Sequence, residues 1–317
     1  MNGKNTVTEK IQNNRLISKY TSKKGIIGIL YKIVRAVIVI GICFMIIYPF
    51  LMKFIVAFMS ETDLYDPTVR YLPRHFSLEN IQYVLNKIDW LHTVPVSLLL
   101  CAAVTLLTIG SCTTIAYGFA RFDFWGNKIL FAMVIFTLIV PPQTMVLAIF
   151  MRFKDFDVAG LINLITGHPL NLLNTYVPFI LMSMLGVGFR NGLYIFLLRQ
   201  YFRGVPRVLD EAAAIDGAST FRIFVQIILP GAVPMMVTVG MFAFAWQWTD
   251  TFYSSLLAPQ SNLVTVVMPT ITAYMDQIMS SMVKNTGTFL LVIPLILLYI
   301  VSQRFMVEGI ERSGIVG

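Results

Sequence analysis

The chain has little charge and few cysteines, and both shortages narrow the class of protein. Only 13% of its 317 residues are charged, whereas 57% are hydrophobic. That composition excludes an ordinary soluble domain and indicates an integral membrane protein. The three cysteines, Cys43, Cys101 and Cys112, all fall within apolar runs. An odd number of cysteines placed in this way argues against a disulfide framework.

Motifs of covalent chemistry are also missing. The sequence has no G-x-x-x-x-G-K-[ST] phosphate loop, so the chain is not expected to bind ATP by itself or to be an enzyme. His75, His92 and His168 are scattered and lack the spacing of metal ligands. No catalytic residue, metal site or cofactor is therefore predicted on this chain.

Long runs without charge dominate the rest of the sequence. Because a helix needs roughly 20 apolar residues to cross a bilayer, the runs predict an all-α integral membrane protein with six transmembrane helices. In chain order they are 36–59, 93–120, 129–151, 170–189, 223–249 and 285–303. Pro141 and Pro142 remove helix donors and predict a kink in the third run, either packed between helices or lining a water-filled cavity. Residues 251–275 are uncharged but rich in proline and polar groups, which favours an outer loop, with a partly re-entrant loop as the alternative.

Basic residues are concentrated before the first run. Residues 1–35 contain eight Lys or Arg and one acid, whereas residues 60–92 contain three basic and five acidic residues. Since Lys and Arg remain on the cytoplasmic side, both termini are expected inside. Residues 1–30 then form a basic cytoplasmic tail, and residues 31–317 form the transmembrane domain. Attraction to anionic membrane lipid explains this tail better than binding to nucleic acid does.

The polar stretch between the fourth and fifth runs has the texture of ordered helices. Pro206 suits the first turn of a helix, residues 208–215 permit a helix, and Gly217 can end it in a left-handed conformation. Ser219 or Thr220 can then cap a second helix. The sequence predicts a rigid knob made of a short helix, a glycine corner and a second helix.

This knob carries a recognisable signature. From Glu211 to Pro230 the residues match E-A-A-x3-G-x9-I-x-L-P at every fixed position, and they resemble the signature loop of permease subunits of binding-protein-dependent ABC importers. The resemblance covers roughly residues 90–317 and implies the type I importer-permease fold. In that family the loop docks into a cleft on the ATPase subunit, which implies a coupling loop at about residues 199–229. The docking residues implied here are Glu211, Ala212, Ala213, Asp216 and Gly217.

Charge and small side chains support a protein interface at the knob. A lone Glu211 would be taken as a solvated loop acid, but three alanines follow it and permit close approach of another surface. The acids Asp210, Glu211 and Asp216 are expected to oppose Arg203, Arg207 and Arg222 in one compact unit.

Two further features resemble the carbohydrate, maltose-type branch of the family. They are residues 197–202 followed by Pro206, and residues 215–218. The resemblance implies half of a translocation pore for a carbohydrate delivered by an external binding protein. It also implies a second, homologous permease chain, two ATP-binding subunits and the prokaryotic plasma membrane. An importer for another solute and an ion-coupled secondary transporter are the alternatives, although no inverted repeat supports the latter.

Polar residues near two spans are candidates for the solute path. Arg190 and Asn191 interrupt the fourth run, and a charge at membrane depth is costly unless it is paired or wet. Trp246, Gln247 and Asp250 lie near the outer end of the fifth run. These five residues are predicted to line a path suited to sugar hydroxyls. The alternatives are that Arg190 snorkels, that Asp250 lies in interfacial water, and that Trp246 belongs to an aromatic belt.

Overall fold

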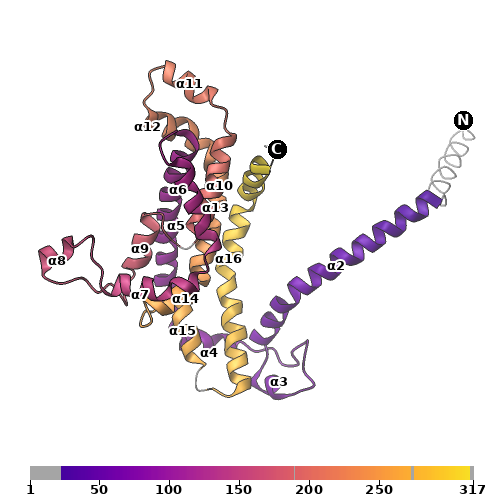
Figure 1. Cartoon of the computed structure of the whole chain (residues 1–317). Helices are drawn as coiled ribbons and strands as arrows, with labels where there is room; N and C mark the ends of the chain where they lie inside the picture. Colours follow the sequence, from indigo (N-terminus) through magenta and orange to yellow (C-terminus); the bar gives the residue numbers. More distant parts are fainter. Residues whose placement is uncertain (1–22, 189, 273–274, 315–317) are drawn as a thin grey trace, which may run out of the picture. The chain divides into compact units, whose positions relative to one another are not determined.

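The computed structural model describes residues 23–188, 190–272 and 275–314. Regular structure in these residues is helical, with isolated bridges and no β-strand in the described ranges, which confirms the all-α prediction. The chain divides into two compact units, one up to Leu78 and the other from Glu79 onward. The elements are labelled in Figure 1.

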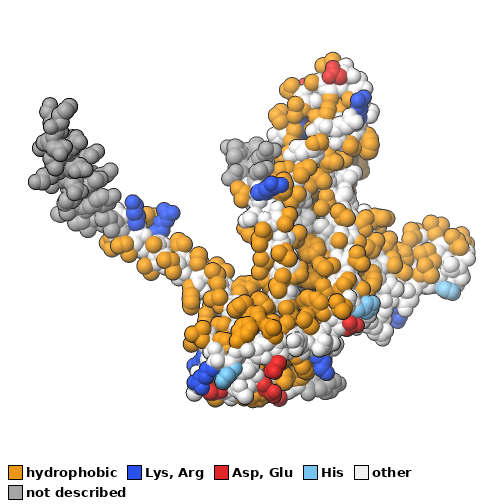
Figure 2. Space-filling view, turned by 180° about the vertical axis from the view of Figure 1, so that it is seen from behind, with side chains coloured by type: hydrophobic (Ala, Val, Ile, Leu, Met, Phe, Trp, Pro, Cys, Tyr) orange, Lys and Arg blue, Asp and Glu red, His pale blue; other side chains and the backbone are white. Residues whose placement is uncertain are grey.

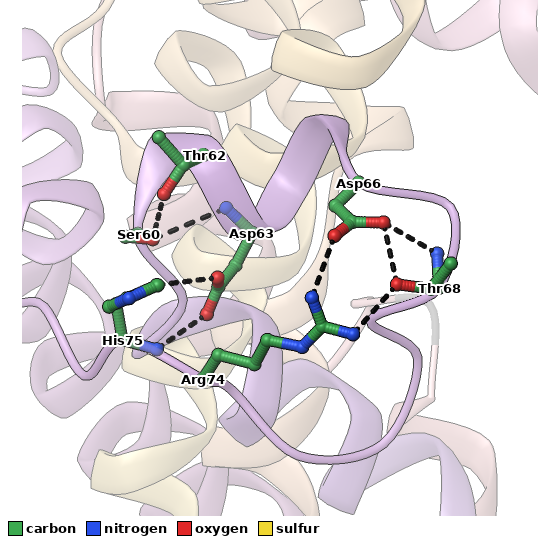
Figure 3. Close-up of polar contacts among 7 residues, drawn as sticks. All are labelled: Ser60, Thr62, Asp63, Asp66, Thr68, Arg74 and His75. Atoms are coloured by element: carbon green, nitrogen blue, oxygen red, sulfur yellow. Dashed lines mark hydrogen bonds and ion pairs between the residues drawn. The ribbon is translucent and has the colours of Figure 1, made fainter.

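The first unit contains α2 (Lys23–Ala57), α3 (Glu61–Tyr65) and an ordered polar segment after α3. Asp63 organises this segment, as Figure 3 shows. Its carboxylate is 3% exposed, accepts the backbone N–H of His75 at 2.8 Å, and lies 3.1 Å from Nδ1 of the His75 ring. The hydrogen bond from the His75 backbone holds the pKa of Asp63 below its usual value. Beside it, Arg74 pairs with Asp66 at 3.1 Å.

The second unit is a bundle around α5 (Trp90–Arg121). Helices α10 (Asn191–Gly204) and α13 (Leu229–Thr249) pack against α5, and α16 (Gln277–Gly314) packs against α13 (Figure 1). Helix α4 (Glu79–Lys87) precedes α5, and its Val84 is fully buried. The core that positions the site comprises Cys112, Ala116, Tyr117, Tyr194, Leu198, Phe202, Met235 and Val239, among others.

Four helices among the described residues are long and apolar enough to cross a membrane: Leu30–Ala57, Trp90–Arg121, Thr220–Thr249 and Gln277–Val307. On the face shown in Figure 2, hydrophobic side chains cover the middle of the helical body. Charged side chains gather at the end that carries α11 (Val208–Ile215). These features fit a multi-pass membrane protein.

The third predicted span is a bent pair of helices. The segment α6 (Asn127–Ile139) meets η1 (Pro142–Met145) and α7 (Val146–Lys154) at an angle of 102°. The kink predicted from Pro141 and Pro142 is confirmed, and its cause is that two successive residues lack an N–H donor. If this pair counts as one span, the described residues contain five candidate spans.

The fourth run does not form the single helix expected over residues 170–189. Helix α8 (Leu161–Thr166) precedes it, and α9 (Val177–Met184) occupies only its second half. After a break, α10 starts at Asn191. Gly186 in the break has φ +70°, a conformation that glycine adopts at little cost and that ends a helix.

Residues 251–275 hold two short helices, α14 (Phe252–Leu257) and α15 (Val264–Ile271). Neither is long enough to cross a bilayer, so the described residues of this stretch contain no spanning helix. Leu257, Leu263 and Val266 are buried and anchor this segment on the bundle.

Candidate functional site

A cavity of about 220 Å³ lies where several of these helices end. It is lined by residues of α5, η1, α9, the break between α9 and α10, the start of α10, the end of α13, and α14. The five residues predicted for the solute path all line it, namely Arg190, Asn191, Trp246, Gln247 and Asp250. Residues far apart in sequence are therefore brought together in one pocket, where these polar groups lie among apolar side chains such as Val104, Phe179 and Phe252.

The backbone explains how Arg190 and Asn191 reach the cavity. Arg190 precedes the first turn of α10 and has non-helical dihedral angles, φ −113° and ψ 2°. Asn191 is the first residue of that helix and is 4% exposed. The helix N-terminus leaves backbone groups without partners inside the helix, so the break places polar groups at the cavity wall.

Arg190 and Trp246 form a cation–π pair across the cavity. The guanidinium carbon lies 3.9 Å from the centre of the Trp246 ring, well within the range of this interaction. Within the part of the chain that the structure describes, no carboxylate lies within ion-pair distance of Arg190. The positive charge is therefore held by an aromatic face.

Asp250 has a structural role as well as a place in the lining. Its carboxylate accepts the N–H of Tyr253 at 3.2 Å, and the N–H and hydroxyl of Ser254 at 2.9 and 3.1 Å. These are the donors at the start of α14, which have no partners within the helix. Asp250 therefore caps α14 and fixes the wall that it forms.

Other lining residues were not predicted from the sequence. Gln143 and Tyr194 line the same cavity. Nδ2 of Asn191 and Oη of Tyr194 are buried, and neither atom finds a hydrogen-bond partner among the described residues. Tyr194 lies one turn after Arg190 on α10, so helical spacing from Arg190 was the signal that could have found it.

The coupling loop matches its predicted local structure closely. Helix α11 spans Val208–Ile215, and Gly217 follows with φ +79°. Ser219 accepts the backbone N–H of Arg222 at 3.3 Å and caps α12 (Thr220–Ile223). The chain then continues through the π-helical turn η2 (Phe224–Ile228) into α13.

The docking residues divide into exposed and buried groups. Glu211, Ala212, Asp216 and Gly217 are exposed, whereas Ala213 is 7% exposed and belongs to the core. The small side chain of Ala213 therefore allows α11 to pack on its own chain. This corrects the expectation that Ala213 is available to a partner.

The charges of the knob pair differently from the prediction. Asp210 lies 3.2 Å from Nε of Arg121 at the end of α5, whose guanidinium also donates to the carbonyl of Val205 at 3.0 Å. Arg222 instead donates to the side chain of Gln226 at 2.9 Å. The expected opposition of Asp210 to arginines within the loop was wrong, because its partner comes from another helix.

The chain is similar to known transport proteins over most of its length. The family model for "Binding-protein-dependent transport system inner membrane component" matches residues 108–308. The probable ABC transporter permease protein YurM of Bacillus subtilis is 26% identical, covering 86% of this chain and 84% of that protein. The arabinooligosaccharides transport system permease protein AraQ of Halalkalibacterium halodurans is 23% identical, and the alignment covers 87% of this chain and 93% of that protein.

Two further similarities come from a sugar-transport protein and from a solved structure. The galactooligosaccharides transport system permease protein GanQ of Bacillus subtilis is 27% identical, covering 86% of this chain and 91% of that protein. A crystal structure of a bacterial ABC transporter involved in the import of the acidic polysaccharide alginate aligns with a TM-score of 0.65. It covers 87% of this chain and 96% of that chain at 19% identity, and so shows the shared fold.

Proposed function

We infer the function from one premise, that this chain belongs to the family of binding-protein-dependent transport system inner membrane components. It is the permease subunit of an ABC importer in a prokaryotic plasma membrane. The observation that carries this is the family match over residues 108–308, which includes the complete signature loop. The chain itself is a transport component and not the enzyme that hydrolyses ATP.

The transported solute is a carbohydrate. Relatives named for arabinooligosaccharide and galactooligosaccharide transport support this. The cavity supports it too, because it combines aromatic faces with amide and hydroxyl groups. Recognition sites for small molecules typically combine apolar walls with a few placed polar groups.

The arrangement in the membrane is six spans with both termini inside. The bent pair α6–α7 and the broken pair α9–α10 then each count as one span, in addition to the four long helices. The basic tail, residues 1–30, falls largely outside the described residues. Its Lys and Arg excess supports a cytoplasmic N-terminus.

The working importer is an assembly. One chain has one coupling loop, and a complete transporter of this kind uses two ATP-binding subunits. A second, homologous permease therefore completes the pore, and an external binding protein delivers the carbohydrate. Glu211, Ala212, Asp216 and Gly217 form the surface that docks on an ATPase, because they are exposed on one rigid corner.

The coupling surface is tested with two substitutions. Glu211→Lys reverses an exposed charge, and like-charge contact at an interface costs several kcal/mol. Gly217→Val forces a β-branched residue to φ +79°, a strained choice, although no atom within 4 Å would clash with its Cβ. Both variants are expected to insert and fold normally but to lose ATPase association, or to lose uptake while basal ATP hydrolysis continues.

The measurements are co-purification of the ATPase and ATP-driven uptake in proteoliposomes. Glu61→Lys, an equal charge reversal at an exposed residue of α3, is the matched control and should retain both. If Glu211→Lys assembles and transports like the parent, the docking role of this surface is wrong. Uptake of neutral oligosaccharides compared with amino acids or peptides separates a carbohydrate importer from an importer for another solute.

A further inference from the structure

We propose that the cavity around Arg190 binds the carboxylate of an acidic sugar, so that the importer favours uronic-acid-containing carbohydrates over neutral ones. This rests on the proposed function, because it names the substrate class of the same cavity. The first observation is the charge of the residues that line the cavity. Arg190 is the only Lys or Arg among the described lining residues, and it has no ion-pair partner in the described chain.

The orientation of Arg190 suits a carboxylate. A guanidinium stacked on an aromatic ring keeps its N–H groups in the plane parallel to that ring, where they remain available. The guanidinium carbon of Arg190 lies 3.9 Å from the centre of the Trp246 ring, a separation that allows this stacking. A carboxylate can then accept two parallel hydrogen bonds from the fork, a geometry that a neutral hydroxyl cannot match.

The acid in the lining does not compete for this cation. Asp250 directs its oxygens to the N–H groups of Tyr253 and Ser254 and to the Ser254 hydroxyl. The oxygens of Asp250 are therefore engaged at the start of α14, and no ion pair joins Asp250 to Arg190 in the described chain.

Two buried donors complete the site. Nδ2 of Asn191 and the hydroxyl of Tyr194 have no hydrogen-bond partner among the described residues, and these side chains are only 4% and 2% exposed. Buried polar groups are nearly always satisfied, and a ligand in the cavity that accepts hydrogen bonds would satisfy these two. The cavity, at about 220 Å³, is smaller than the roughly 300 Å³ at which drug-sized pockets begin. It suits one sugar ring at a time.

The test compares D-galacturonate with D-galactose, which differ only in the carboxylate or hydroxymethyl group at one carbon. Each sugar is titrated by saturation-transfer NMR into the purified complex of this chain with its partner permease and ATPases. We expect galacturonate to bind at least about tenfold more tightly than galactose, about 1.4 kcal/mol. Arg190→Gln should remove that preference, bringing galacturonate to the level of galactose.

The matched control is Arg152→Gln. Arg152 also lies over an aromatic ring, that of Phe156 at 6.0 Å, but it does not line the cavity. This variant should keep the full preference for galacturonate. Thermal unfolding of both variants checks that the preference is not lost through misfolding.

Three results would overturn the proposal. The first is equal binding of the two sugars to the parent complex. The second is equal weakening of both sugars by Arg190→Gln. The third is that the parent complex binds neither sugar. If Arg190→Gln then also causes the two permeases to dissociate, the partner of Arg190 is an acidic residue of the other permease. If the importer still takes up a neutral oligosaccharide with ATP, only the preference for acidic sugars is wrong and the proposed importer function is retained. If it takes up no sugar at all, the proposed carbohydrate-importer function is wrong as well.

Discussion

At the scale of single residues, one glycine sets how closely two helices approach. A Cβ built on Gly192 of α10 would lie 2.5 Å from Oγ1 of Thr137 and 2.9 Å from the carbonyl oxygen of Val134, both on α6. The second atom belongs to the backbone and cannot move aside easily. The glycine therefore lets the N-terminal turn of α10, beside the cavity, press directly against α6.

We expect Gly192→Ala to destabilise the protein by about 1–3 kcal/mol, the usual cost of overpacking. Gly118→Ala is the matched control, because Gly118 lies in α5 with nothing within 4 Å of its Cβ position. Its substitution should be neutral or stabilise by about 0.5–1 kcal/mol through helix propensity. Thermal unfolding in detergent measures both. Equal unfolding temperatures for the two variants would contradict a close approach at Gly192.

At the scale of elements, the coupling loop is tied to the bundle by one ion pair. The side chain of Arg121, at the end of α5, is 6% exposed, and that of Asp210, on α11, is 23% exposed. Arg121 also holds the carbonyl of Val205. A movement of α11 is therefore passed directly to α5, which carries part of the cavity wall near its middle, at Val104 and Thr108.

Asp210→Asn should loosen α11 without unfolding the bundle. The change leaves the Arg121 charge without its carboxylate, at a cost of about 1–3 kcal/mol. Trypsin should then cleave faster after Arg203 and Arg207, which are both exposed. Asp216→Asn is the control, because Asp216 is exposed and has no ion pair in the described chain. Equal cleavage rates in the two variants would show that the ion pair does not hold the loop.

Local sequence signals predicted the coupling loop well, and distant contacts escaped them. The bounds of α11, the left-handed Gly217 and the Ser219 cap depend on interactions within a few residues, which the sequence displays directly. The burial of Ala213 depends on packing in a core cluster drawn from several helices, and the partner of Asp210 lies on α5, about 90 residues earlier along the chain. No spacing rule encodes such a contact.

The same distinction applies to the cavity. Arg190 and Asp250 stood out because charge is rare in apolar runs. Their convergence on one cavity, the stacking of Arg190 on Trp246 and the orphan groups at Asn191 and Tyr194 required the packed structure. The failure of residues 170–189 to form one helix has a similar origin. Hydropathy reports only apolar composition, whereas the positive φ of Gly186 sets where α9 ends.

At the scale of the whole molecule, orientation follows from the uneven distribution of charge. With six spans both termini lie in the cytoplasm, whereas a seventh span would place the C-terminus outside. In a variant with Cys43, Cys101 and Cys112 replaced by alanine, we expect Ser313→Cys to resist a membrane-impermeant maleimide in intact cells and to react after permeabilisation. Thr68→Cys, in the segment after α3, should react in intact cells. Efficient labelling of Ser313→Cys from outside would mean that the span count is wrong.

The bent pair α6–α7 has a consequence for the lipid environment. At roughly 1.5 Å per residue, the 13 residues of α6 extend about 20 Å, short of the roughly 30 Å hydrocarbon core of a typical bilayer. After α6 the chain bends by 102° into η1 and α7, and Pro142 and Gln143 of η1 line the cavity. Local thinning of the bilayer relieves such a mismatch at a modest cost for each ångström. Transport should therefore be faster in proteoliposomes of short-chain phospholipids than in those of long-chain phospholipids, so that acyl-chain length acts as a physical regulator of this importer.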